Sequence, residues 1–178
     1  MAKFEKVSRF NEVELPMPVR KTAHSAGYDF VVAEDITIEP WTEMFNLMNM
    51  NTNTAGAPLT LEDVALVTKT FKAKPSLVST GMKCELDEGT YLELSVRSSS
   101  PLKYWLLLAN GVGIIDKDYY NNPDNEGEIF FQIYNLSPFP ITLKKGDAIG
   151  QGIIHKYGLT EDDVATGERV GGFGSTSK

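Results

Sequence analysis

Several residues and motifs that define large classes of protein are scarce or missing in this sequence. It has one cysteine and two histidines among 178 residues, so neither an intramolecular disulfide nor a cluster of thiolate metal ligands can form. No Gly-Lys dipeptide occurs, which excludes a Walker A loop, and the histidines lack the HExxH spacing of zinc hydrolases. Cys84 is expected to be a buried core thiol. The remaining candidates for a site are carboxylates, guanidinium groups, hydroxyls and backbone amides.

The chain also has no excess of basic residues and no long apolar run. Lys and Arg number 17 against 24 Asp and Glu, a formal charge of −7, which disfavours extended binding to nucleic acid because the phosphates would be repelled. The most apolar stretch, 104–115, is interrupted by Asn110, Gly111 and Gly113 and falls short of the roughly 20 residues that cross a bilayer. The first ten residues show no export signal. We expect a soluble, cytoplasmic protein that does not contact membranes.

Length and composition favour one domain spanning residues 1–178. A domain commonly has about 100–200 residues. Hydrophobic residues make up 42% of the chain and charged residues 23%, which is the usual composition of folded globular proteins.

Short runs of alternating apolar and polar residues dominate the chain. Two such runs, 82–86 and 92–96, flank a turn at 87–89 and predict a hairpin. The period of two returns at 129–133 and on both sides of a turn within 141–154. Many short strands separated by turns predict an all-β fold, whether sandwich, jelly roll or barrel.

Residues 41–75 depart from this pattern. Thr60 and Asp63 match a capping box, apolar residues follow at helical spacing, and lysines precede Pro75, which together predict a short helix at 61–73. Before the helix lies an apolar, methionine-rich run: Met44, Phe45, Leu47, Met48 and Met50. The segment is predicted to cover an edge of the β structure. The alternative is a docking surface for a protein partner.

Five short segments combine residues that could carry chemistry, although each alone is equally typical of a turn, a strand or a tail. Residues 26–30 place a carboxylate after a glycine, and 97–101 combine a guanidinium with hydroxyls suited to phosphate oxygens. Residues 110–119 join two glycines to an acid and an aromatic ring. Residues 145–154 carry one amide on an apolar strand, and 169–176 set an arginine, a phenylalanine and hydroxyls among glycines.

Together and in this order, the five segments resemble the motifs of the trimeric dUTP diphosphatase (dUTPase) family. The resemblance covers residues 23–33 and most of 97–176. It implies a distorted jelly-roll β-barrel and a homotrimer whose active sites are shared among subunits. It also implies Mg²⁺-assisted hydrolysis of dUTP to dUMP and pyrophosphate, which lowers dUTP and supplies dUMP for thymidylate synthesis.

The resemblance assigns the catalytic role to Asp116, as the general base for the water that attacks the α-phosphorus. Tyr119 resembles the ring that packs under the deoxyribose and rejects a 2′-hydroxyl. The residues implied to read uracil are Asn110, Gly111, Gly113 and Ile114.

The remaining roles concern the phosphates and the metal. The implied phosphate cradle, supplied by a neighbouring chain, consists of Arg97, Ser98, Ser99 and Gln151. Asp29 matches the acid that holds Mg²⁺ through water. The glycine-rich tail, 169–178, resembles a flexible lid in which Phe173 stacks on uracil. The implied contacts to the γ-phosphate come from Arg169, Ser175 and Thr176.

The sequence departs from the family pattern in places. Ser99 stands where a glycine is usual, Arg169 lies one position nearer the glycine pair, and residues 120–125 lengthen the tip after Tyr119. The alternatives are an enzyme similar to dCTP deaminase, and a nucleotide-gated regulatory protein that uses 41–75 as its contact surface.

Overall fold

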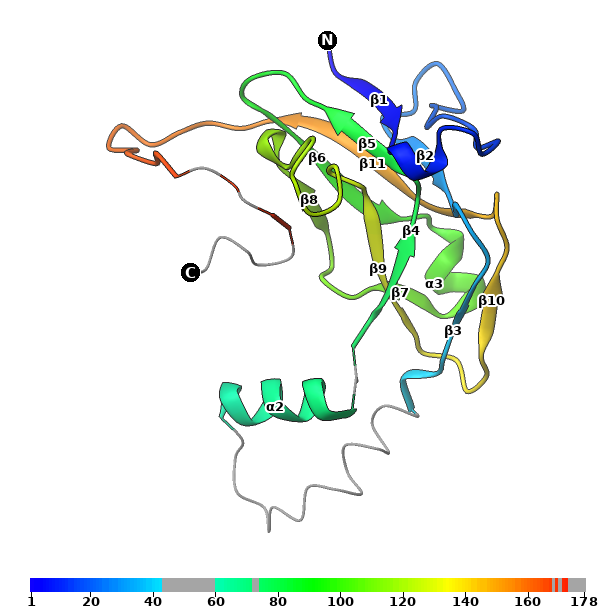
Figure 1. Cartoon of the computed structure of the whole chain (residues 1–178). Coiled ribbons are helices and arrows are strands. Elements are labelled where there is room, and N and C mark those ends of the chain that lie inside the picture. Colours follow the sequence, from blue (N-terminus) through cyan, green and yellow to red (C-terminus); the bar gives the residue numbers. More distant parts are fainter. Residues whose placement is uncertain (43–59, 72–73, 168, 170, 173–178) are drawn as a thin grey trace.

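The computed structural model describes residues 1–42, 60–71, 74–167, 169 and 171–172. Its elements, labelled in Figure 1, are β1 (Lys3–Lys6), η1 (Ser8–Phe10), β2 (Tyr28–Val31), β3 (Ile36–Ile38), α2 (Leu61–Phe71), β4 (Ser76–Ser79), β5 (Met82–Glu85), β6 (Thr90–Val96), α3 (Ser99–Tyr104), β7 (Leu106–Leu108), β8 (Gly113–Ile115), η2 (Lys117–Tyr119), β9 (Phe130–Asn135), β10 (Ile141–Leu143) and β11 (Ala148–Lys156).

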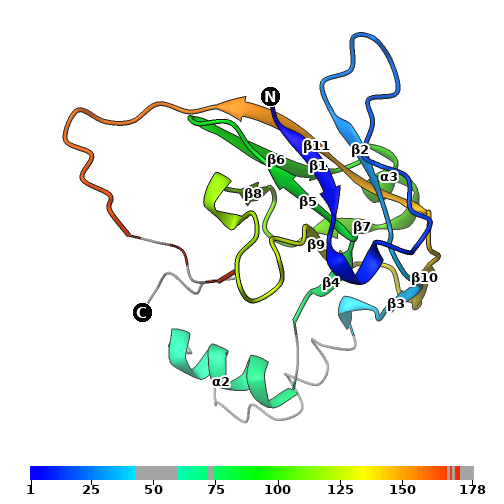
Figure 2. The same cartoon turned by 45° about the horizontal axis from the view of Figure 1, so that its top comes forward.

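The predicted all-β architecture is confirmed, and the strands are divided among several sheets. The largest has the order β2-β11-β6-β8, the next β4-β9-β7, and two strand pairs, β1-β5 and β10-β3, complete the set. Figures 1 and 2 show these sheets wrapped around a common interior. In the part of the chain that the structure describes they form a jelly-roll-like arrangement and do not close into one barrel.

The core lies between the four-stranded and the three-stranded sheets. Phe30 of β2 and Phe131 of β9 are fully buried, with ring centroids 5.8 Å apart. Leu92 and Leu94 of β6 face the same interior. A Cβ atom at Gly150 would lie 2.1 Å from Cε1 of Phe131, so only glycine lets β11 approach this ring.

The strand positions predicted around the turn at 87–89 are confirmed, but the predicted hairpin is wrong. β5 pairs with β1, whereas β6 lies between β11 and β8 in another sheet. The turn does form, since the backbone N–H of Thr90 donates to the carbonyl of Asp87 at 3.3 Å. Alternation reports which face of a strand is buried, and two strands of different sheets can bury their faces in one core.

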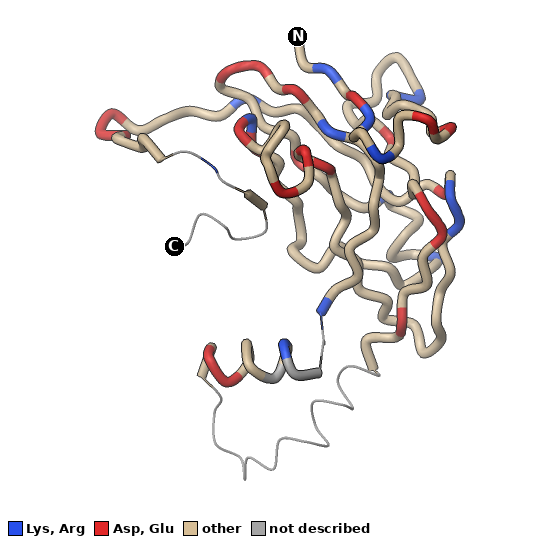
Figure 3. The backbone as a smooth tube through the Cα atoms, in the orientation of Figure 1, with Lys and Arg blue, Asp and Glu red and all other residues tan. Residues whose placement is uncertain are grey.

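The predicted helix at 61–73 is confirmed as α2, and its N-terminus has the predicted capping box. Thr60 N–H donates to Oδ2 of Asp63 at 2.9 Å, and Asp63 N–H donates to Oγ1 of Thr60 at 3.2 Å. The hydrogen bonds from Thr60 lower the pKa of Asp63. Glu62 and Asp63 lie in the first turn of α2 and Lys69 in its last, as the helix dipole favours. Figure 3 shows acidic colour at the start of this helix and basic colour toward its end.

The described part of α2 does not cover a sheet edge as expected. Leu61 is 89% and Leu66 65% exposed, and Figures 1 and 2 show α2 apart from the sheets. The methionine-rich run at 44–50 lies outside the described residues, so its role as a docking surface stays a prediction. Among the described residues, no helix is long and apolar enough to span a membrane.

Candidate active site

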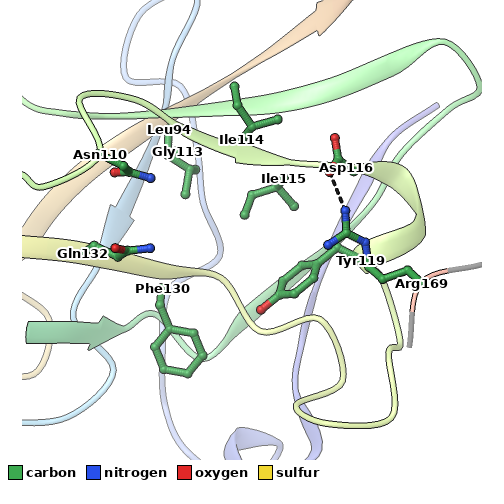
Figure 4. A pocket seen from close by; sticks show the side chains of 10 residues that line it. All are labelled: Leu94, Asn110, Gly113, Ile114, Ile115, Asp116, Tyr119, Phe130, Gln132 and Arg169. Atoms are coloured by element: carbon green, nitrogen blue, oxygen red, sulfur yellow. Dashed lines mark hydrogen bonds and ion pairs between the residues drawn. The ribbon is translucent and has the colours of Figure 1, made fainter. Parts of the chain in front are cut away.

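Strand β8 and the turn that follows it border a pocket of about 240 Å³. The pocket is lined by Leu94, Asn110, Gly113, Ile114, Ile115, Asp116, Tyr119, Phe130, Gln132 and Arg169. Figure 4 shows the amides of Asn110 and Gln132 at one end, with Asp116 and Arg169 at the other. Five of the predicted site residues therefore meet Arg169 of the C-terminal tail in one cavity.

A tight turn carries the chain from β7 into β8. The N–H of Gly111 donates to the carbonyl of Leu108 at 3.1 Å, and that of Val112 to the carbonyl of Asn110 at 2.8 Å. Gly111 has a φ of +72°, a conformation that favours glycine. Gly111 is exposed and belongs to this turn; it does not line the pocket.

The strands on the two sides of this turn do not form a hairpin, because β7 pairs with β9 and β8 with β6. The two strands instead lie in different sheets, with β8 at the edge of its own. An edge strand pairs with its sheet along one side only. The pocket thus has a strand edge beside it, which offers peptide groups to a ligand.

Asp116 and Tyr119 both line this pocket. Asp116 follows β8 directly, and its side chain is 50% exposed. Tyr119 ends η2 and is buried; its hydroxyl donates to the carbonyl of Glu128 at 2.9 Å. Burial raises the pKa of Tyr119, so the phenol stays protonated and able to donate. The site therefore combines an accessible carboxylate with a fixed aromatic ring.

The C-terminal tail returns to the pocket of its own chain. Nη2 of Arg169 donates to Oδ2 of Asp116 at 2.6 Å, and its Nε donates to Oδ1 of Asp118 at 2.7 Å. The guanidinium carbon lies 5.9 Å from the centroid of the Tyr119 ring. A Cβ atom at Gly172 would come within 2.8 Å of the same ring, so the tail packs closely on Tyr119.

A second group of predicted residues gathers on β2, β11 and the end of β6. Gln151 lies between Asp29 and Ser95 in the register of the sheet. Nε of Arg97 is 3.8 Å from Oδ1 of Asp29, and Nε2 of Gln151 donates to Oγ of Ser95 at 3.4 Å. A Cβ atom at Gly27 would lie 2.5 Å from Oε1 of Gln151, so the glycine before Asp29 makes room for this amide.

The residues of the pocket and the group around Gln151 lie on opposite faces of the four-stranded sheet. Leu94 is the cross-strand partner of Gly113 and lines the pocket, while Ser95 is the partner of Gln151. Partners across a pair of strands share a face, and consecutive residues alternate. One chain therefore does not bring the Gln151 group to its own pocket.

Ser98 and Ser99 lie where β6 passes into α3, a short helix that the sequence did not predict. Ser98 precedes α3 and is exposed, while Ser99 begins it. With Arg97, Ser99 lines a separate cavity of about 330 Å³. Three further predicted site residues, Phe173, Ser175 and Thr176, lie outside the described residues.

Sequence reasoning missed three polar or aromatic residues of the site. Gln132 and Phe130 come from the face of β9 opposite the buried Phe131. Phe130 could have been found from the sequence, because a large apolar side chain on the partly exposed face of a strand indicates a contact or a binding site. Asp118 binds Arg169, but nothing in the sequence linked the two residues.

The described residues contain no cluster of three or more His, Cys, Asp or Glu side chains that could hold a metal ion. Asp29 is the predicted metal-site acid, and its side chain is 14% exposed. A single carboxylate fits Mg²⁺, which keeps several waters and takes other ligands from substrate phosphates.

Comparison with known proteins identifies the family. The dUTPase family model matches residues 48–177. The deoxyuridine 5′-triphosphate nucleotidohydrolase of Lactococcus lactis subsp. lactis is 34% identical over 175 residues, which cover 97% of this chain and 95% of the relative. That of Corynebacterium diphtheriae is 32% identical over 169 residues, covering 92% and 86%.

Solved structures agree with the sequence relatives. The dUTPase from Streptococcus mutans superposes with a TM-score of 0.67 at 35% identity, covering 89% of this chain and 98% of that one. The dUTPase from phage phi11 of S. aureus has a TM-score of 0.60 at 17% identity and covers 93% and 96%, a likeness of fold. Because the family model matches well over half of the chain and both relatives are more than 30% identical over most of its length, the chain belongs to the dUTPase family.

Proposed function

We propose that the protein hydrolyses dUTP to dUMP and pyrophosphate in the cytoplasm. The observation that carries this proposal is the pocket beside β8, in which the amides of Asn110 and Gln132 lie at one end and Asp116 at the other. The family relationship supports dUTP over the alternative of a dCTP deaminase-like reaction.

The base is read by peptide groups of β8 and by amide side chains. The position of β8 at a sheet edge leaves one side of the strand for a ligand. Asn110 and Gln132 both line the pocket, and the backbone N–H of Ala109 donates to the carbonyl of Gln132 at 2.7 Å. A fixed pattern of donors and acceptors suits uracil and leaves cytosine with unpaired groups, which is an effective basis for rejection.

Asp116 acts as the general base in the chemical step. It orients a water for in-line attack on the α-phosphorus and accepts its proton. Its half-exposed position next to the pocket supports this role. Tyr119, fixed through its hydroxyl, packs under the sugar where a 2′-hydroxyl would collide.

The phosphates are bound by the second group of residues, supplied by a neighbouring chain of a homotrimer. Because Gln151 and Arg97 belong to the face of the sheet opposite the pocket, a complete site needs a second copy. Exposed apolar residues support a contact between chains: Leu102 in α3 is 81%, Trp105 directly after α3 is 62%, and Phe139 after β9 is 70% exposed. Exposed apolar surface is typical of interaction sites when it forms large patches.

Mg²⁺ is the proposed cofactor, with Asp29 as the residue that would hold it through water. When bound, the metal neutralises phosphate charge. In the isolated chain, Nε of Arg97 lies 3.8 Å from Oδ1 of Asp29 and pairs with that carboxylate.

The tail, 169–178, is the proposed lid, and Gly172 already packs on Tyr119.

A substrate panel tests the proposal. Purified protein with Mg²⁺ should release pyrophosphate from dUTP and not from UTP, dTTP or dCTP, and should release no ammonia from dCTP. Cleavage of all four nucleotides, or of none, contradicts it. The molecular mass in solution tests the shared site, since a monomer that is fully active would exclude it.

A further inference from the structure

The loop between η2 and β9 is built around two asparagine side chains. Its ends are joined where the N–H of Asn121 donates to the carbonyl of Glu126 at 3.0 Å. Asn121 and Glu126 have φ values of 57° and 59°, and Gly127 one of 79°. A Cβ atom at Gly127 would lie 2.5 Å from the carbonyl oxygen of Tyr119. The loop is therefore a defined structure closed directly against Tyr119.

Asn122 organises the inside of the loop. Its side chain is buried, and Oδ1 accepts the backbone N–H groups of Asp124 and Asn125 at 3.0 and 3.3 Å. Its Nδ2 donates to the carbonyl of Tyr119 at 2.9 Å and to Oδ1 of Asn125 at 2.8 Å. One amide thus connects the loop, the second asparagine and the backbone of Tyr119.

Asn125 holds the other end of the tyrosine. Its Nδ2 donates to the hydroxyl of Tyr119 at 2.8 Å, and its Oδ1 accepts the N–H of Gly127 at 3.1 Å. The hydroxyl of Tyr119 itself donates to the carbonyl of Glu128 at 2.9 Å. Tyr119 is therefore bound through its carbonyl by Asn122 and through its hydroxyl by Asn125.

The loop is also attached to the rest of the fold. Glu126 accepts hydrogen bonds from the N–H and hydroxyl of Ser8. Nζ of Lys83 donates to Oδ1 of Asn121 at 2.6 Å. These contacts tie the loop to the N-terminal segment and to β5, so a change in its interior shifts the tyrosine relative to a fixed frame.

We propose that Asn122 and Asn125 are positioning residues that set the depth of the Tyr119 ring in the pocket and thereby determine how strongly the enzyme prefers dUTP to UTP. This inference rests on the proposed function of the pocket. A 2′-hydroxyl is rejected by shape only while the ring cannot retreat. Two hydrogen bonds at the hydroxyl, and two at the carbonyl from the side chain and backbone of Asn122, prevent that retreat.

Asn125→Asp is the decisive variant, because it keeps Oδ1 and replaces the donor that Tyr119 needs with an acceptor. Asn121→Asp is the matched control: it makes the same change in the same loop, where the side chain bonds Lys83 and not Tyr119. The measurement is kcat/KM for dUTP and for UTP. We expect the dUTP/UTP ratio to fall roughly tenfold in Asn125→Asp, the size expected for one unpaired buried group, and to be unchanged in Asn121→Asp.

Tyr119→Phe removes the hydrogen bond from Asn125 together with the one to the carbonyl of Glu128 and provides a second test. It should lower the ratio at least as much as Asn125→Asp, and adding Asn125→Asp to it should lower the ratio little further, because the phenylalanine leaves no hydroxyl for residue 125 to hold. An unchanged ratio in either folded single variant, or additive effects in the double variant, would overturn the inference. Failure of the wild-type protein to hydrolyse dUTP would instead overturn the proposed function.

Discussion

Arg169 and Asp116 form an ion pair at one end of the pocket, with 2.6 Å between Nη2 and Oδ2. The proposed roles place Arg169 on the γ-phosphate and Asp116 on the attacking water. One guanidinium cannot serve both partners at once in these positions. In the chain without nucleotide, the tail therefore rests on the carboxylate that it must leave when a triphosphate binds.

Weakening this resting contact should favour substrate binding. Asp118→Asn removes the second partner of Arg169, whose Nε lies 2.7 Å from Oδ1 of Asp118. Asp118 is 56% exposed, so the effect should be as small as for other exposed ion pairs. The KM for dUTP should fall about two- to fivefold. Steady-state kinetics measure it. Asp162→Asn is the control for charge alone, and an equal fall in KM there would contradict the explanation.

Asp116→Asn should abolish most turnover while leaving the fold intact. The amide cannot accept a proton from water, so kcat should fall by about 10²–10⁴. The side chain is half exposed, so the melting temperature should change little. Single-turnover assays with equal protein concentrations, together with thermal melts, separate the two effects. Wild-type turnover in this variant would remove Asp116 from its proposed role.

Gly150→Ala should destabilise the protein strongly. A methyl group at this position would lie 2.1 Å from Cε1 of Phe131 and 2.7 Å from the carbonyl oxygen of Ser95, and overpacking of this kind costs about 1–3 kcal/mol. Gly158→Ala is the control, because nothing lies within 4 Å of the added atom. Urea unfolding of both variants gives the comparison. Equal midpoints would show that β11 does not need this close approach.

Cys84 should resist alkylation in the native protein. It is 1% exposed, and burial raises the pKa of its thiol to about 12. At pH 8 the thiol is therefore both protonated and inaccessible, and the thiolate is the reactive form. Mass spectrometry after iodoacetamide treatment should show no adduct unless the protein is first unfolded. Rapid labelling under native conditions would contradict the burial of this residue.

Acid should release the N-terminal segment from the loop at 120–127. Hydrogen bonds from Ser8, followed by the nearby charge of Lys83, lower the pKa of Glu126. The stabilisation from Glu126 is therefore present above the unfolded value of about 4.3 and is lost as pH falls through the lower folded value. Protection of residues 8–10 against hydrogen exchange, taken relative to the intrinsic exchange rate at each pH, should fall below about pH 4 in the wild type. In Glu126→Gln this protection should no longer depend on pH in this window.

Local sequence determined much of this protein. Alternation located the strands at 82–86, 92–96 and 129–133, because a half-buried strand exposes every second residue whatever its partner. Thr60 and Asp63 located the start of α2, because capping involves residues three apart. The order of the five segments, matched to a known family, named six of the residues that line the pocket: Asn110, Gly113, Ile114, Asp116, Tyr119 and Arg169.

Tertiary structure alone decided which strands pair and which side chains meet. The turn at 87–89 joins strands of different sheets, and no local pattern distinguishes that from a hairpin. Asp118 and Asn125 became site residues only through contacts with Arg169 and Tyr119. Likewise, the separation of Gln151 from the pocket follows from cross-strand register. These relationships depend on contacts between distant residues, which the packing of the whole chain sets and a short stretch of sequence does not record.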